Sequence, residues 1–136
     1  MVDPISSFRD TLPTLLYTAA QSRQLDRLAQ QLPGIDGSVL MRRAGSAAFD
    51  VLRSHWPQAR RLLIFCGGGN NGGDGYVLAE LAQRAGFSVT LVALVAAEQL
   101  RGEALVACRN AVAAGVEPLP FAAERLVDTQ HDLLVD

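Results

Sequence analysis

The stretch Ile64-Phe65-Cys66-Gly67-Gly68-Gly69-Asn70-Asn71-Gly72-Gly73-Asp74-Gly75-Tyr76 decides the fold of this chain. Six glycines fall within the nine positions 67–75. They follow the apolar run 62–66 and precede the segment 76–82, whose apolar residues have helical spacing. A strand, a glycine-rich turn and a helix in this order present backbone N–H groups and a helix N-terminus to an anion. The stretch therefore predicts a phosphate-binding loop.

Two common kinds of phosphate loop fit the sequence poorly. A Walker A loop needs a lysine, and the chain contains none, which excludes a P-loop NTPase. The spacing Gly67-x-Gly69-x-x-Gly72 satisfies the dinucleotide pattern, whose usual companion is an acidic residue about 20 positions later. The second predicted strand, 88–95, is followed by two alanines, and Glu98 falls where we expect the next helix to begin. This disfavours a classical NAD-dependent dehydrogenase. A plain turn in which Asp74 caps the following helix is the simplest alternative.

Apolar periodicity along the chain predicts strands that alternate with helices. This alternation is typical of a Rossmann-like three-layer α/β/α sandwich with a mostly parallel sheet. Gly86 and Gly115 are expected to end helices. The predicted strands are 61–66, 88–95, a short one within 117–120, and 133–135. The predicted helices are one capped by Thr18 or Ser22 and running to Gln31, one from 36–38 to Trp56, and 76–85, 98–114 and 122–129.

The first two predicted helices each have an apolar stripe that we expect to be buried. In the first helix the stripe is Leu25, Leu28 and Leu32. In the second, apolar residues at i, i+3 and i+4 spacing define the stripe Leu40, Ala44, Ala47, Ala48, Val51 and Leu52. Residues 1–16 show no period and are interpreted as an N-terminal arm, followed by one domain over 17–136.

Composition excludes several classes of partner. The 136 residues are 49% hydrophobic, with a formal net charge of −2, and all twelve cationic side chains are scattered arginines. This argues against nucleic-acid binding. No apolar run approaches the roughly 20 residues of a membrane span, so no membrane partner is expected. Cys66 and Cys108 lack CxxC spacing and are predicted to be buried free thiols in a reducing cytoplasm.

The run Gly67-x-Gly69-Asn70-Asn71-Gly72-Gly73-Asp74-Gly75 resembles the signature of the NAD(P)H-hydrate epimerases, the YjeF N-terminal domain family. Leu40-Met41-Arg42-Arg43-Ala44-Gly45 resembles the family's "LMxxAG" helix, and Leu133-Leu134-Val135-Asp136 resembles the start of its "hVDAhFGTG" segment. The resemblance extends from about Tyr17 to the last residue. In this family more strands and helices follow, often with a dehydratase domain. The resemblance thus implies an N-terminal portion that is incomplete at its C-terminus.

The resemblance also implies a function and a site. The function is that of an isomerase that interconverts the R and S epimers of NADHX and NADPHX for cofactor repair, acting as a cytoplasmic homodimer. The alternative is a non-catalytic dinucleotide-binding or protein-interaction module of the same fold. The residues implied to bind the dinucleotide are Asn70, Asn71, Gly72, Gly73 and Asp74. A potassium ion is implied at Asn71 and Asp136, and Asp136 is also the candidate catalytic carboxylate.

The position of Asp136 gives this assignment a physical basis. It directly follows the buried-strand pattern 133–135, so we expect its carboxylate at the carboxyl edge of the sheet, beside the glycine-rich loop. An amide oxygen and a carboxylate, completed by backbone carbonyls, suit a hard monovalent cation. The alternative is an ordinary carboxylate at the end of a strand, next to solvent.

Overall fold

The computed structural model describes residues 15–122 and 130–136. The chain forms two compact units, Met1–Asp36 and Gly37–Asp136. Most of the predicted arm, and the helix predicted over 122–129, lie outside the described residues. In the described part, no helix is long and apolar enough to cross a membrane.

The first unit contains helix α2 (Ala19–Ala29), which begins with a capping box. The Gln21 N–H donates to Thr18 Oγ1 at 3.3 Å, and the Thr18 N–H donates to Gln21 Oε1 at 2.8 Å. Thr18, rather than Ser22, is therefore the N-cap. The predicted buried stripe is wrong, because no residue of α2 is buried and its leucines are about half exposed. An amphipathic pattern shows that a helix has an apolar face, but it does not supply the surface that covers it.

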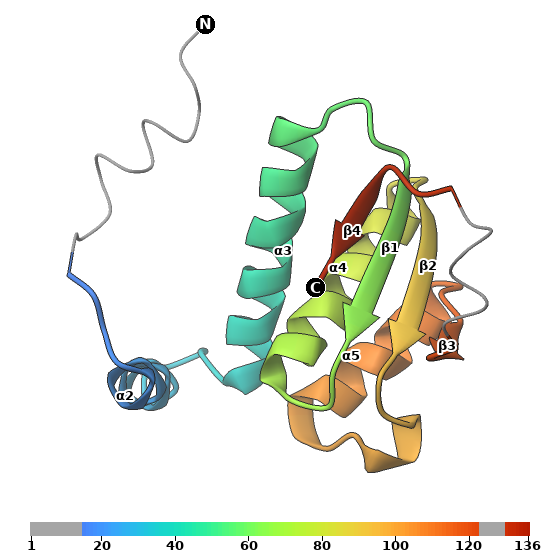
Figure 1. The fold of residues 1–136 in the computed structure, drawn as a ribbon. Helices are drawn as coiled ribbons and strands as arrows, with labels where there is room; N and C mark the ends of the chain where they lie inside the picture. The colour runs from blue at the N-terminus through green and yellow to red at the C-terminus, as the bar shows by residue number, and fades with distance from the viewer. Residues whose placement is uncertain (1–14, 123–129) are drawn as a thin grey trace, which may run out of the picture. The chain divides into compact units, whose positions relative to one another are not determined.

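The second unit is a parallel sheet of four strands in the order β3-β2-β1-β4 (Figure 1). The α/β fold class with a parallel sheet is confirmed. In this sheet β1 is central, since Ile64 pairs with Leu91 of β2 on one side and with Val135 of β4 on the other. The elements are α3 (Gly37–His55), β1 (Arg61–Cys66), α4 (Asn70–Arg84), β2 (Ser88–Ala93), the 3-10 helix η1 (Ala97–Gln99), α5 (Gly102–Ala113), β3 (Pro118–Pro120) and β4 (Leu133–Val135).

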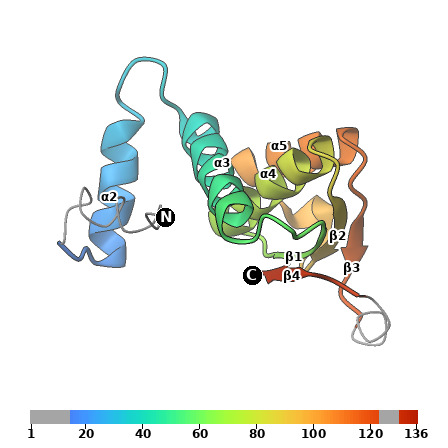
Figure 2. The ribbon, with the colours of Figure 1, turned by 90° about the horizontal axis from the view of Figure 1, so that it is seen from above.

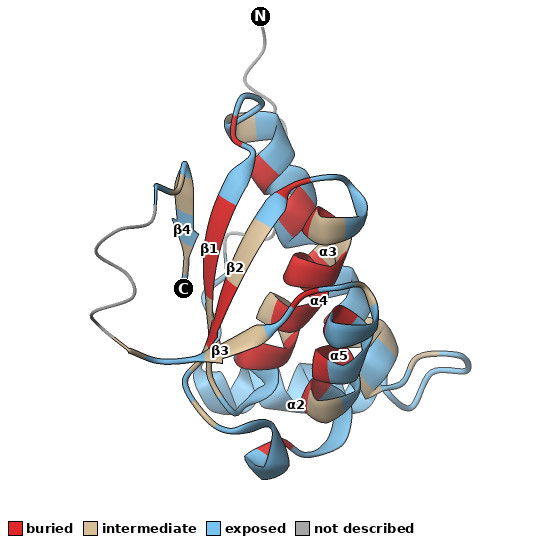
Figure 3. Ribbon diagram, turned by 90° about the vertical axis from the view of Figure 1, so that its right-hand side faces the viewer, coloured by how far each residue is buried: buried red, intermediate tan, exposed pale blue. Residues whose placement is uncertain are grey.

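Helices α3, α4 and α5 form one layer on one face of this sheet, with α4 in the middle (Figure 2). A second helical layer on the opposite face, as in a full sandwich, is not among the elements of residues 15–122 and 130–136. The core lies between the sheet and α4, where Leu62, Ile64 and Cys66 meet Tyr76 and Val77 (Figure 3). All five side chains are at most 5% exposed.

The structure shifts two predictions made from apolar spacing. The face of α3 that contacts the core consists of Met41, Gly45, Phe49 and Leu52. Of the predicted stripe only Leu52 is buried and Leu40 is half-buried, whereas its three alanines and Val51 are exposed. The error was to count alanines as core residues, whereas Phe49 and Met41 offer more apolar area to bury. Helix α5 begins at Gly102, because residues Ala97–Gln99, including Glu98, form a separate 3-10 turn.

Gly86 and Gly115 end α4 and α5 as predicted. Their φ angles are 86° and 96°, in the left-handed region that glycine adopts without a Cβ clash.

The edge strand β4 is attached to β1 by Asp132. This carboxylate accepts hydrogen bonds from the backbone N–H groups of Arg60 (2.8 Å) and Arg61 (2.9 Å). It also forms an ion pair with the Arg61 guanidinium at 2.6 Å. The Arg61 side chain first, and the two backbone donors next, hold the pKa of Asp132 well below its usual range. Because β4 is only three residues long, it forms few ladder hydrogen bonds with β1, and the Asp132 contacts add to them.

We predict that Asp132→Asn weakens the attachment of β4 in a pH-dependent way. A depressed folded-state pKa means that the carboxylate stabilises the fold above its unfolded pKa of about 3.9, and that this contribution is lost as the pH falls further. The difference in urea midpoint between the wild type and the variant should thus be present at pH 7 and shrink below about pH 4. Asp50→Asn, which alters an exposed carboxylate of α3, is the control. A difference that stayed constant down to pH 2 would contradict the ionic role of Asp132.

Candidate functional site

Helix α4 begins at Asn70, whereas the sequence pattern placed its start at Tyr76. Gly69 is the N-cap, with φ −95° and ψ −170°, and the Gly73 N–H donates to the Gly69 carbonyl at 3.1 Å. The signature residues from Asn70 to Asp74 are therefore the first helical residues, not an open turn, and Asp74 is not the cap. Asparagine and glycine are poor helix formers, so tertiary packing, not propensity, places the helix start here.

Three glycines of the signature are required by that packing. A Cβ on Gly72 would lie 2.1 Å from the Gly67 carbonyl oxygen, and a Cβ on Gly75 would lie 2.8 Å from Cys66 Sγ. A Cβ on Gly73 would lie 2.4 Å from Met41 Cε of α3 and 3.2 Å from Ala104 Cα of α5. Protein atoms fill the space beside Gly72 and Gly73, so neither glycine leaves room for a phosphate where its Cβ would be. Their assignment to dinucleotide binding stays a prediction.

The glycines that face open space come earlier in the loop. A Cβ on Gly67 or Gly69 would meet no heavy atom within 4 Å, while one on Gly68 would touch Val95 at 3.2 Å. Sequence reasoning assigned the ligand role to Gly72 and Gly73 and passed over Gly67 and Gly69. Periodicity could have separated the two groups, since Gly72 and Gly73 precede Tyr76 by four and three residues, the separations that share one helical face.

The loop and helix together form a candidate anion site. The first N–H groups of α4 have no acceptor within the helix, and no side chain caps them. Asn70 and Asn71 are exposed there, and the first turn contains no acidic residue. An uncapped helix N-terminus at the end of a buried parallel strand favours a negatively charged ligand.

The neighbouring helices begin at the same edge of the sheet (Figure 1). Gly73 lies between Met41, in the second turn of α3, and Ala104, in the first turn of α5. Three helices thus direct their N-termini toward the edge where β1 and β2 end. The partial positive charges of their N-termini thus all lie at this edge.

Asp136 reaches this edge as well. Val135 pairs with Ile64, so the next residue of β4 lies alongside Phe65, close to the start of the loop. Asp136 is exposed, as is Asn71. Their donor types, a carboxylate and an amide oxygen beside loop carbonyls, fit a hard monovalent cation. Within the described ranges no group of three or more His, Cys, Asp or Glu side chains is placed to hold a metal ion, so carbonyls would have to complete the coordination.

The buried thiols behind the loop are not candidates for catalysis. Cys66 and Cys108 are free and buried, as predicted. Burial raises the pKa of the Cys66 thiol to about 12, and it also raises the pKa of Cys108 and of the Tyr76 hydroxyl. All three groups are protonated at neutral pH, so none supplies a thiolate or phenolate. They contribute as core side chains below the loop.

A strand, an open glycine loop and a helix N-terminus without a side-chain cap define a Rossmann-like α/β domain with a candidate anion site at its carboxyl edge. The model of the family described as "YjeF-related protein N-terminus" matches residues 37–136. The chain belongs to this family.

Three curated proteins are similar in sequence to this chain. The chain is 44% identical over 121 residues to the "Bifunctional NAD(P)H-hydrate repair enzyme Nnr" of Coxiella burnetii, covering 85% of this chain and 25% of that protein. It is 44% identical over 127 residues to the protein of that name from Escherichia coli, covering 93% and 24%. It is 37% identical over 100 residues to the "NAD(P)H-hydrate epimerase" of Rhodopirellula baltica, covering 74% and 41%. The chain thus spans about a quarter of each bifunctional relative.

A solved structure shares the fold. The crystal structure of yeast ynu0, YNL200c, superposes with a TM-score of 0.63 at 20% sequence identity, over 78% of this chain and 47% of that one.

The two groups of glycines make a testable distinction. Gly72→Ala should destabilise the fold by about 3 kcal/mol or more, because its Cβ would overlap the backbone of Gly67. Gly69→Ala, with φ at −95° and open space around its Cβ, should leave the unfolding midpoint nearly unchanged. Urea unfolding of both variants measures this. Equal midpoints would contradict the packing role of Gly72.

Proposed function

We propose that the protein containing this chain is an NAD(P)H-hydrate epimerase, an isomerase that interconverts the R and S epimers of NADHX and NADPHX. The observation that carries the proposal is the open, uncapped N-terminus of α4, within a signature held by a member of this family. Relatives that are 37–44% identical bear the name of that activity or of a bifunctional repair enzyme. A pyrophosphate is the part of NADHX and NADPHX that such a helix start would bind.

The chemistry needs one proton donor and acceptor. The hydroxyl at C6 of the hydrated ring is adjacent to the ring nitrogen, whose lone pair can expel it once the oxygen is protonated. Water leaves, and C6 becomes part of a planar iminium. A second water then adds to the opposite face and gives up a proton, which regenerates the hydrate with inverted configuration. A carboxyl group assists both steps if it is protonated at the start: as the acid it donates its proton to the leaving hydroxyl, and as the resulting carboxylate it takes a proton from the incoming water.

We assign that role to Asp136, at the carboxyl edge beside the loop. In this proposal Asn70, Asn71, Gly72, Gly73 and Asp74 form the dinucleotide site, with the half-buried Gly67 and the exposed Gly69 against the pyrophosphate. Asn71 and Asp136 would hold a potassium ion, which supplies positive charge next to the pyrophosphate. Residues of the longer protein would complete the site, because the relatives extend well beyond the matched region.

We further propose that the protein is a cytoplasmic homodimer. The exposed leucines of α2, Leu25 and Leu28, provide apolar surface that self-association could bury.

The activity itself gives the first test. We predict that the full-length protein accelerates consumption of R-NADHX when an excess of S-specific dehydratase is present. Absorbance of the NADH that is formed measures the rate. Binding of NADP⁺ without any acceleration would instead identify the non-catalytic dinucleotide-binding alternative.

The second test concerns Asp136. We predict that Asp136→Ala in the full-length protein lowers the epimerisation rate about 100-fold or more, since general acid–base assistance is worth that much. The variant should also lose any preference for potassium over sodium, because a cation ligand is removed. Glu117→Ala, which removes an exposed carboxylate just before β3, is the matched control. A variant that keeps both its rate and its salt preference would show that Asp136 is an ordinary strand-end carboxylate.

A further inference from the structure

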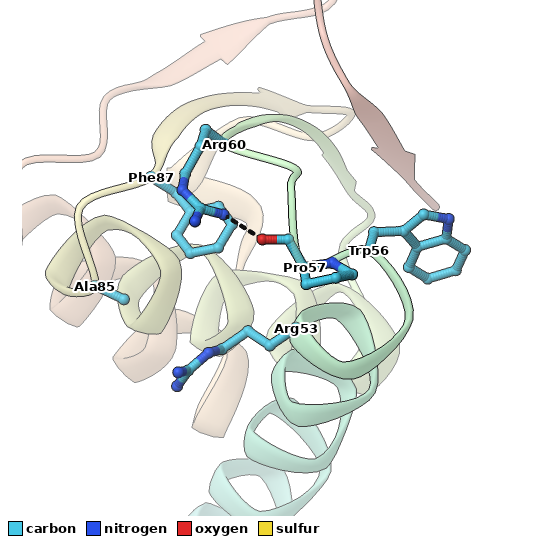
Figure 4. A pocket seen from close by; sticks show the side chains of 6 residues that line it. All are labelled: Arg53, Trp56, Pro57, Arg60, Ala85 and Phe87. Atoms are coloured by element: carbon cyan, nitrogen blue, oxygen red, sulfur yellow. Dashed lines mark hydrogen bonds between the residues drawn. The ribbon is translucent and has the colours of Figure 1, made fainter. Parts of the chain in front are cut away.

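We propose that the amino edge of the sheet carries a second binding site, for a small organic anion with an apolar body. A cavity of about 310 Å³ lies there, at the opposite end of the sheet from the glycine loop (Figure 4). This volume is at the lower end of the range found for small-molecule pockets, about 300–1,000 Å³. The lining residues are Arg53, Trp56, Pro57, Arg60, Ala85 and Phe87.

Two arginines at this cavity are held on a pair of core aromatic rings. The guanidinium of Arg53 lies over the Phe49 ring at 5.6 Å, and that of Arg60 lies over the Phe87 ring at 5.5 Å. The two rings contact each other edge to face, with centroids 5.6 Å apart. Both rings are buried, at 7% and 8% exposure, so they are fixed by the core. Each guanidinium therefore has a fixed aromatic surface to lie on, while both arginine side chains stay exposed to solvent.

Neither arginine has an acidic partner in the described ranges. Three other arginines of this unit have one, since Arg42 and Arg84 pair with Glu80 and Arg61 pairs with Asp132, whereas Arg43, Arg101 and Arg109 also lack an ion pair among the described residues. Arg60 uses a single nitrogen, Nη1, to donate to the carbonyls of Pro57 at 2.9 Å and Ala59 at 2.6 Å. Its Nε and Nη2 have no acceptor among the described residues. Planar guanidinium donors that lack a carboxylate are suited to a carboxylate or phosphate oxyanion.

A helix dipole explains only part of this arrangement. Arg53 stands in the last turn of α3, where a cation offsets the partial negative charge of the helix C-terminus. Arg60, in contrast, lies outside every helix, immediately before β1. Arg60 therefore brings a second positive charge to the cavity, beside that of Arg53. Two like charges at one cavity are unfavourable unless an anion binds between them. Pro57 and Ala85 add apolar surface beside the arginines, whereas the Trp56 indole points away from them (Figure 4). The ligand is thus an oxyanion with a small apolar group.

Phenyl phosphate, inorganic phosphate and the neutral benzyl alcohol separate the two parts of this recognition. Calorimetric titration of the full-length protein should show phenyl phosphate binding about tenfold tighter than inorganic phosphate, and benzyl alcohol not binding measurably. Arg53→Gln and Arg60→Gln should each weaken phenyl phosphate about tenfold or more, because each removes a charge-assisted donor. Arg43→Gln, which alters another exposed arginine of α3, should change it by less than about twofold.

Three results would overturn the proposal. The first is phenyl phosphate binding that Arg53→Gln leaves unchanged, which would place the ligand elsewhere, for instance at the glycine loop. The second is equal affinity for phenyl phosphate and inorganic phosphate. The third is a loss of phenyl phosphate affinity in Arg43→Gln equal to that in Arg53→Gln, which would indicate general electrostatic attraction. Arg60→Gln also removes two bonds to backbone carbonyls, so its melting temperature is measured alongside. Arg53 makes no such bonds among the described residues, so Arg53→Gln still tests the proposal if Arg60→Gln unfolds.

Discussion

The close contact between the first turn of α4 and the backbone of Gly67 is the constraint on which this domain depends. With 2.1 Å between the site of a Gly72 Cβ and the Gly67 oxygen, only glycine lets the helix begin directly against the end of β1. That contact brings Gly73 against α3 and α5, and it leaves the uncapped N–H groups at the open edge. One backbone approach thus sets both the packing of the helical layer and the direction of the candidate anion site.

A buried carboxylate holds the same helices together further along. Glu80 of α4 is 5% exposed and accepts hydrogen bonds from Arg42 of α3 at 2.6 Å and from Arg84 at 3.0 Å. Two arginines pair with this buried carboxylate, and the bond to Arg42 links α4 to α3, so removal of Arg42 would break that link while Arg84 stays paired. The Met41–Gly73 contact involves the same pair of helices: Gly73 precedes Glu80 on α4, and Met41 directly precedes Arg42 on α3. The ion pair therefore supports the geometry of the loop without facing it.

The sequence predicted what depends on local pattern and missed what depends on tertiary contact. The β1 strand, the parallel α/β class and the helix stops at Gly86 and Gly115 follow from apolar runs and glycine conformation, and the structure has them all. The helical state of Asn70–Asp74 could not be read from propensity, because contacts with Gly67, Met41 and Ala104 impose it on poor helix formers. The two arginines at the amino edge, Arg53 and Arg60, are seven residues apart in the sequence, and neither position alone indicates a binding site.

The topology places helix termini of opposite partial charge at the two ends of the parallel sheet. Parallel strands joined by helices on one face place every helix N-terminus at the carboxyl edge and every helix C-terminus at the amino edge. The carboxyl edge attracts anions through backbone N–H groups, and no cationic side chain is needed for that. At the amino edge the helix ends repel anions, so only side-chain charge can reverse the sign. Arg53 and Arg60, held on Phe49 and Phe87, supply that charge, and an arginine pair is the kind of group an anion site at this edge requires.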